Sequence, residues 1–180
     1  MIWLSSSTIA RLRDALRASG QRPSITAGDP SAFGPGGAEL AMASVEYGPI
    51  CEAMYLMMSA DGAIGHDERH VLKGALRNLS GDALRSVHIE ALLDRSAKNA
   101  AEQGRDARLR EVVAQLQGDP ARCEAAFVLA AAVAFADNAI ADEENETLNR
   151  LAQGLGIDES RADELLDQVE ADLADRPLET

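Results

Sequence analysis

The sequence predicts an all-α protein, and three observations lead to this expectation. Of its 180 residues 46% are hydrophobic, yet it has only three Phe, two Tyr and one Trp, while Ala and Leu are abundant. Such a composition favours helices over a β-sandwich, which needs β-branched and aromatic residues. Apolar residues also recur at helical spacing, and two of the apolar segments lead into similar loops. We therefore expect an internally duplicated helical bundle with two Asp-Gly/Asn-x-Ile-type loops related by pseudo-twofold symmetry.

The N-terminal part divides into a short helix and a linker. Residues 1–20 form the predicted amphipathic helix, in which Ile9, Leu12 and Leu16 follow a run of Ser and Thr suited to capping. Between Gly20 and Gly37 eight of eighteen residues are Gly or Pro, so residues 21–44 are assigned to a linker. We expect the helix to bury its apolar face on its own domain, the alternative being a detachable arm.

Apolar stripes predict four helices in the first repeat, about residues 45–118. The first begins near Pro49 and ends near Ser59, and the second follows the next loop. Asp82 is expected to cap the third, and the fourth ends at Gly118. Their apolar positions are, in turn, Ile50, Cys51, Met54, Tyr55 and Met58; Val71, Leu72, Ala75, Leu76 and Leu79; Leu84, Val87, Ala91 and Leu92; and Leu109, Val112, Val113 and Leu116.

The second repeat, about residues 119–176, completes the predicted domain of residues 45–176. Asp119 and Pro120 suit the cap and the first position of a helix. That helix contains the most apolar segment, residues 125–136, which is too short for a membrane span of about 20 residues. We therefore expect a buried core helix.

The loops of the two repeats align at an offset of 76 residues. Of the fourteen residues 59–72, six are identical to their counterparts in 135–148, among them the acids Asp61 and Asp137 and the acids Glu68 and Glu144. Gly62 pairs with Asn138, and both residue types tolerate a left-handed backbone. The two loops are therefore expected to turn in the same way.

The stretch "DGAIGHDERH", residues 61–70, resembles two metal motifs but fits neither. An EF-hand needs oxygen ligands at loop positions one and three, which are occupied by Met57 and Ser59 here and by apolar residues in the second copy. A zinc peptidase motif has Glu after its first histidine, whereas Asp67 follows His66, and the second repeat has no histidine there. Both sites are rejected.

What remains is an Asp followed by a Glu seven residues later, in both repeats. Each acid could simply cap a turn or a helix N-terminus. If the halves pack about a pseudo-twofold axis, however, Asp61, Glu68, Asp137 and Glu144 can converge. Four carboxylates repel one another, and a divalent cation would relieve that repulsion.

The charge of the chain restricts the classes of molecule that it can bind. The net charge is −13, and residues 122–180 alone carry fifteen acids against four Arg. Because this negative charge repels the phosphate backbone, we expect no nucleic-acid partner. Cations or a basic protein surface fit better. Cys51 and Cys123 fall in apolar patterns and are expected to be buried thiols. The N-terminus does not resemble a secretory signal, so we expect a cytoplasmic protein.

The two motif copies, "ADGAIGHDE" and "ADNAIADEE", resemble the signature of the tellurite-resistance TerB-like family. The resemblance covers roughly residues 38–173, and the second copy has Asn138 where the family usually has Gly. It implies a cytoplasmic, all-helical module that binds a divalent cation through Asp61, Glu68, Asp137 and Glu144. It also implies a stress-response system with other stress-response proteins as partners, and possible peripheral association at the inner face of the membrane.

These observations favour a non-catalytic cation-binding module. Calcium is the first choice of metal, with magnesium or manganese as alternatives. No Ser, Cys or His lies in a recognisable catalytic arrangement and no Gly-rich phosphate loop follows a strand, so we do not expect an enzyme. The alternative is an acidic protein-interaction scaffold with no metal requirement.

Overall fold

The computed structural model describes residues 6–19, 37–60, 62, 64, 66–135 and 142–174, except for the side chains of residues 6, 39, 40, 43, 66–68 and 173. Within these ranges every regular element is a helix, which confirms the all-α prediction. The helices are α1 (Ser6–Ala18), α2 (Gly37–Glu46), α3 (Gly48–Met58), α4 (His66–Leu79), α5 (Ser86–Gln103), α6 (Arg105–Leu116), α7 (Pro120–Ala134), α8 (Asp142–Leu155) and α9 (Glu159–Ala174).

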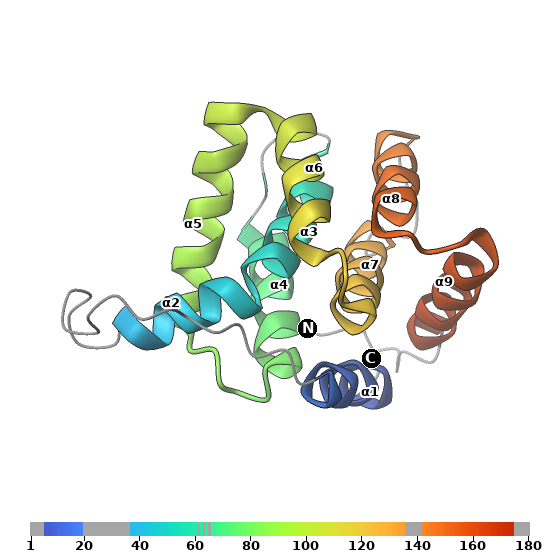
Figure 1. The fold of residues 1–180 in the computed structure, drawn as a ribbon, viewed down its shortest axis with the longest axis horizontal. Coiled ribbons are helices and arrows are strands. Elements are labelled where there is room, and N and C mark those ends of the chain that lie inside the picture. Colours follow the sequence, from blue (N-terminus) through green and yellow to red (C-terminus); the bar gives the residue numbers. More distant parts are fainter. Residues whose placement is uncertain are drawn as a thin grey trace.

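The helices α3 and α7 pack against each other at the centre of the bundle (Figure 1). Helix α7 also contacts α1, α8 and α9, while α3 contacts α4, α5 and α6. Every residue from 125 to 134 is buried, because neighbours cover α7 on all sides. This result confirms the predicted core helix. Among the described residues no helix is both long and apolar enough to span a bilayer.

The start of α7 follows the predicted capping chemistry. The Asp119 carboxylate accepts hydrogen bonds from the backbone N–H groups of Ala121 and Arg122 at 3.1 and 3.2 Å. Pro120 occupies the first helical position, where the missing N–H costs nothing. Asp119 is itself buried, so the cap belongs to the core rather than to the surface.

The predicted cap of α5 is wrong. Asp82 lies in the turn that ends α4, with a positive φ of 63°, and its carboxylate accepts a hydrogen bond from Arg77 at 2.7 Å. Its N–H bonds back to the Arg77 carbonyl, as in a helix C-terminal motif. The helix begins only at Ser86, after an extended Arg85. Asp tolerates both positions, and the requirements of the α4 terminus decide between them.

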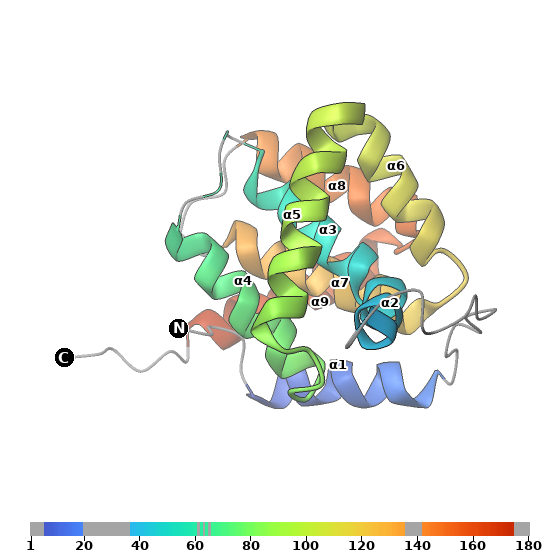
Figure 2. The same ribbon diagram turned by 90° about the vertical axis from the view of Figure 1, so that its left-hand side faces the viewer.

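The prediction of a linker misses α2. Residues 37–44, assigned to the Gly/Pro-rich linker, lie in this helix. The segment "GAELAMASVE" is rich in Ala, Glu, Leu and Met, which have high helix propensity, but it has no wide apolar stripe. It packs on α3 and α5, as Figure 2 shows. Packing against α3 and α5 therefore stabilises a helix that the local apolar pattern does not predict.

Helix α1 packs against α7 and α4, below the rest of the bundle in Figure 2. Ile9 and Leu12 are 4% and 2% exposed, so the apolar stripe of the helix is buried as expected. Arg11 adds a hydrogen bond of 2.5 Å to Gln168 on α9. The N-terminal helix is therefore part of the folded bundle.

Candidate functional site

Most of the predicted metal ligands lie outside the described residues. Asp61 and Asp137 are not among the described residues, and the side chain of Glu68 is likewise outside them. Glu144 is described and lies half-buried in the first turn of α8. The four-carboxylate arrangement therefore stays a prediction. The structure describes its surroundings through the helix ends that flank the two loops.

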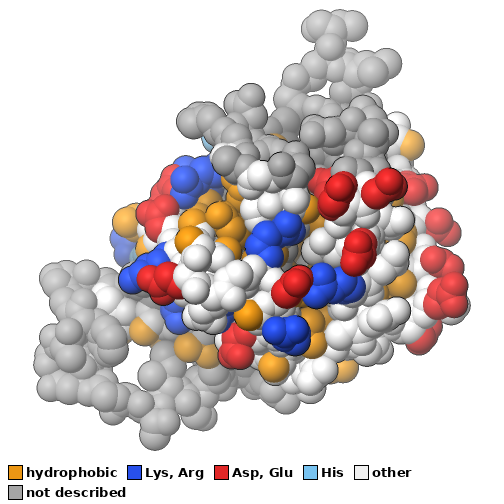
Figure 3. Space-filling model, turned by 90° about the horizontal axis from the view of Figure 1, so that it is seen from above, with side chains coloured by type: hydrophobic (Ala, Val, Ile, Leu, Met, Phe, Trp, Pro, Cys, Tyr) orange, Lys and Arg blue, Asp and Glu red, His pale blue; other side chains and the backbone are white. Residues whose placement is uncertain are grey.

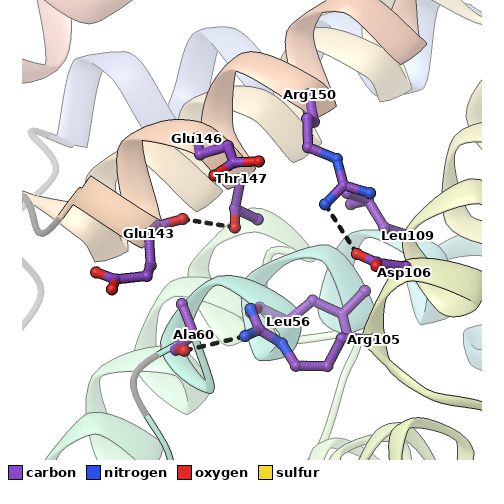
Figure 4. A pocket seen from close by; sticks show the side chains of 9 residues that line it. All are labelled: Leu56, Ala60, Arg105, Asp106, Leu109, Glu143, Glu146, Thr147 and Arg150. Carbon is purple, nitrogen blue, oxygen red and sulfur yellow. Dashed lines mark hydrogen bonds and ion pairs between the residues drawn. The ribbon is translucent and has the colours of Figure 1, made fainter.

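One pocket connects the approach to the first loop with the helix that follows the second loop (Figure 4). Its volume is about 150 Å³. Leu56 and Ala60 line it from the end of α3, and Glu143 and Glu146 line it from the start of α8. The remaining lining residues are Thr147 and Arg150 of α8 and Arg105, Asp106 and Leu109 of α6. The flanks of the two motifs are thus neighbours across α6.

Arg105 holds the end of α3. Its guanidinium donates hydrogen bonds to the carbonyl oxygens of Leu56 and Ala60 at 2.6 and 3.0 Å (Figure 4). The C-terminal end of a helix has carbonyl groups without intrahelical partners and a partial negative charge, both of which a cation satisfies. Ala60 directly precedes Asp61, so Arg105 fixes the backbone where the chain enters the first acidic loop.

The next residue of α6 contacts the second half of the protein. Arg150 of α8 donates to the Asp106 carboxylate at 2.8 Å. This hydrogen bond and the charge of Arg150 lower the pKa of Asp106. Because the pair is exposed, solvent weakens it, and it is expected to orient α8 rather than to stabilise the fold strongly.

A buried ion pair anchors α6 one turn further along. Arg108 donates to both carboxylate oxygens of Glu52 on α3, at 2.7 and 2.9 Å. Both side chains are less than a tenth exposed. The hydrogen bonds to Glu52 raise the pKa of Arg108, so the guanidinium stays charged. Helix α6 is therefore held against α3 by this ion pair independently of the contacts of Arg105.

Acidic side chains dominate the part of the surface near α8 and α9. Figure 3 shows them gathered on the right, where these helices lie. The first turn of α8 alone carries Asp142, Glu143 and Glu144. Acids at a helix N-terminus stabilise the helix through its dipole, so these residues have a structural function at the start of α8.

The described side chains do not form an assembled metal site. No group of three or more His, Cys, Asp or Glu among them could hold an ion. His70 is exposed on α4 and His88 is buried on α5, while the side chain of His66 lies outside the described residues. A cation site made from the motif acids thus requires the loop residues Asp61 and Asp137.

Both cysteines are buried, as expected. Burial raises the pKa of Cys51 to about 12, and it also raises the pKa of Cys123. A thiol that stays protonated is a poor nucleophile and a poor metal ligand. Neither cysteine therefore contributes to a candidate site.

Sequence reasoning did not identify Arg105, Asp106 or Arg150. Arg105 lies 45 and 49 residues from its two carbonyl partners, and Asp106 lies 44 residues from Arg150. No local pattern signals contacts over such distances. Gly104, with a φ of 82°, separates α5 from α6 and marks where these two charged residues begin a new helix.

Comparison with protein families gives one match. A family model described as tellurite resistance protein TerB matches residues 50–168, well over half of the chain. No curated protein and no solved structure matches the sequence. The matched range begins in α3 and ends in α9, so it includes both loops and leaves α1 and α2 outside.

Proposed function

The chain belongs to the TerB tellurite-resistance family, and on this premise we propose that it is a non-catalytic module that binds a divalent cation. The proposed ligands are Asp61, Glu68, Asp137 and Glu144. Calcium is the first candidate, with magnesium and manganese as alternatives. All four ligands offer carboxylate oxygens, which these hard cations prefer, and the set contains no sulfur or imidazole that would favour a softer metal.

The observation that carries the proposal is the shared pocket between the end of α3 and the start of α8. Ala60, which precedes the first motif acid, and Glu143, which precedes the last one, both line it. These two positions are 83 residues apart in sequence. Such proximity of the motif flanks is what a site shared by both loops requires.

The proposal includes an internal duplication. Helices α3, α4 and α5 follow one another in the first half as α7, α8 and α9 do in the second, and α4 and α8 both contain 14 residues. The central α3–α7 contact is compatible with a pseudo-twofold axis between the halves. Each half would then contribute one Asp and one Glu to the same cation.

The cellular setting is proposed from the family. A tellurite-resistance module of this kind would act in a cytoplasmic stress-response system, together with other proteins of that system. Peripheral association at the inner membrane face is part of the same proposal. None of these functions requires a catalytic group, and the chemistry assigned to the motif acids is binding alone.

Calorimetric melting of the full chain tests cation binding. Scans with calcium, magnesium, manganese and a chelator should give the highest melting temperature with calcium, because a ligand that binds only the folded state stabilises it. At a free concentration one hundred times Kd the expected gain is about 2.7 kcal/mol. Identical curves under all four conditions would refute the proposal.

Substitutions separate the acids from the histidines. Asp61→Ala and Asp137→Ala should each weaken calcium binding in isothermal titration calorimetry. The double substitution His66→Ala and His70→Ala should leave binding unchanged, because a hard cation prefers carboxylate to imidazole. If the histidine pair proves essential and the bound metal is zinc, the carboxylate assignment is wrong.

The second candidate is an acidic interaction scaffold, which the exposed acids of α8 and α9 favour. Residues 122–180 carry a net charge of −11, and Figure 3 shows acidic side chains concentrated over these helices. A scaffold of this type would bind a basic partner surface equally well with and without a chelator. A pull-down with a polybasic peptide, repeated in calcium and in chelator, distinguishes it from the cation module.

A further inference from the structure

The arginines of α1 fall into two groups. Arg11 faces α9, where it donates to Gln168 at 2.5 Å, and it lies 3.9 Å from Glu124 of α7. Arg13 and Arg17 are one turn apart and approach the turn between α4 and α5 instead. Among the described residues Arg17 forms no ion pair, and the nearest acid to Arg13 is its sequence neighbour Asp14, at 3.9 Å. Two cations thus lack good acidic partners in a chain of net charge −13.

Gly81 brings these two guanidinium groups together. A Cβ atom at this position would lie 3.0 Å from Nη2 of Arg17 and 3.9 Å from Nη1 of Arg13. The two nitrogens are therefore within about 7 Å of each other, a separation at which like charges repel unless they are screened. The absence of a side chain, together with the φ of +61°, lets the backbone turn directly beneath Arg17.

A pocket of about 380 Å³ lies at this place. It is lined by Ile9, Ala10, Arg13, Asn78, Gly81 and Asp82 and is called the α1–turn pocket below. Nε of Arg13 is buried and has no hydrogen-bond partner among the described residues. The acid in the lining, Asp82, is already paired with Arg77 at 2.7 Å. The pocket therefore contains an unused donor of Arg13, and the guanidinium of Arg17, which is not itself in the lining, lies beside its lining residue Gly81.

We propose that the α1–turn pocket binds a phosphate-type oxyanion through Arg13, which lines it, and Arg17, which lies beside the lining residue Gly81. Guanidinium groups present several N–H donors in a fixed plane that matches phosphate oxygens, and an anion between two of them removes their mutual repulsion. The amide of Asn78 adds a further neutral donor to the lining. The ligand is a free phosphate or phosphomonoester, or the phosphate of an anionic lipid headgroup.

This site is independent of the cation proposal. It uses α1 and the α4–α5 turn, whereas the cation site uses the two motif loops, and α1 lies outside the range that matches the family. Because the rest of the chain is strongly acidic, the attraction should be local and should weaken with added salt. That salt dependence distinguishes an electrostatic site from an apolar one.

The test is isothermal titration of inorganic phosphate into the full chain at constant ionic strength set with chloride. We expect saturable binding to the wild type, and binding at least tenfold weaker to the double variant Arg13→Gln/Arg17→Gln. Arg11→Gln is the matched control, since it removes a charge from the same helix but from an arginine that faces α9. It should bind phosphate as the wild type does.

Melting curves of the three proteins establish that each is folded, which is expected because Ile9 and Leu12 anchor α1. A second arm uses sedimentation with vesicles of phosphatidylcholine alone or with added phosphatidic acid. Binding to the acidic vesicles that is lost in the double variant, without binding of free phosphate, supports the site and assigns it to lipid headgroups. The proposal is overturned if the wild type binds neither probe, or if the double variant binds as well as the wild type.

Discussion

Arg105 and Arg122 make the same type of contact in two different regions. Arg105 donates to two carbonyl oxygens at the C-terminal end of α3, at 2.6 and 3.0 Å. Arg122 donates to the last two carbonyl oxygens of α2, at 3.0 and 3.2 Å. In both side chains Nε is buried without a hydrogen-bond partner among the described residues. The two guanidinium groups therefore bind the same kind of helix-end carbonyl group.

What differs is the segment that follows each helix end. After α2 the chain passes through Tyr47 into the buried helix α3. After α3 it enters the first acidic loop, and the neighbour of Arg105, Asp106, contacts α8, which follows the second loop. The same interaction thus stabilises a helix junction in one region and borders the candidate cation site in the other. The two arginines have the same chemistry, and only the place of Arg105 next to the first acidic loop connects it to the candidate cation site.

Removal of Arg108 should have the largest effect, and it tests whether α6 is anchored independently of Arg105. The substitution Arg108→Ala leaves the Glu52 carboxylate buried and unpaired, which should lower the free energy of unfolding by about 3–5 kcal/mol. Urea denaturation measures the loss. The double variant Glu52→Leu/Arg108→Leu should recover most of it, because an apolar pair needs no compensation. A loss below about 1 kcal/mol in the single variant would mean that Arg105, and not Arg108, is the main anchor of α6 on α3.

Substitution of Arg105 and Arg122 should separate an effect on stability from an effect on calcium binding. Arg105→Ala and Arg122→Ala each remove hydrogen bonds from a charged donor, so each should cost about 1–3 kcal/mol in urea denaturation. Arg105→Ala should in addition weaken calcium binding about tenfold, equivalent to about 1.4 kcal/mol, because the entry to the first loop is released. Arg122→Ala should leave calcium affinity unchanged.

Hydrogen exchange provides a readout of the same comparison without metal. In the calcium-free protein Arg105→Ala should speed amide exchange over residues 59–65 more than Arg122→Ala does, because it frees the backbone at Ala60. Equal exchange in this segment for both variants would show that Arg105 is a stabilising contact only. If the wild type binds no calcium, the exchange result still decides whether Arg105 orders the loop.

The elements that the sequence predicts well are those with local causes. The Asp119 cap and the uninterrupted apolar run of α7 depend on neighbouring residues, and both are confirmed. The prediction for Asp82 names the wrong helix end, because a residue suited to a cap is also suited to a left-handed turn. Helix α2 escapes prediction because its stability comes from α3 and α5 rather than from its own pattern.

The acids of the candidate site are proposed from the sequence, whereas its surroundings come from the structure. The doubled spacing of Asp and Glu is visible in the sequence, so the four proposed ligands follow from the residues alone. Arg105, Asp106 and Arg108 reach partners 44 to 56 residues away, which only the packing of α6 against α3 and α8 brings near. The pairing of a charged residue across such a separation has no sequence signature.

The smallest expected effect concerns the contact of α6 with α8. Arg150 lowers the pKa of Asp106, so the ionised pair contributes stability above the usual Asp value of about 3.9, and this contribution is lost as the pH falls through the lowered value. Asp106→Asn should therefore melt slightly below the wild type at pH 7, and the two melting temperatures should converge in high salt and as the pH falls through the lowered pKa of Asp106. Glu102→Gln, which removes an exposed pair with Lys98 within α5, is the control for a surface charge with no interhelix contact. The calcium affinities of two variants add a further test. If Asp106→Asn binds calcium as the wild type does while Arg105→Ala binds it more weakly, α6 influences the candidate cation site through its contacts with α3. A gap in melting temperature that persists in high salt would show that geometry, and not charge, makes Asp106 hold α8.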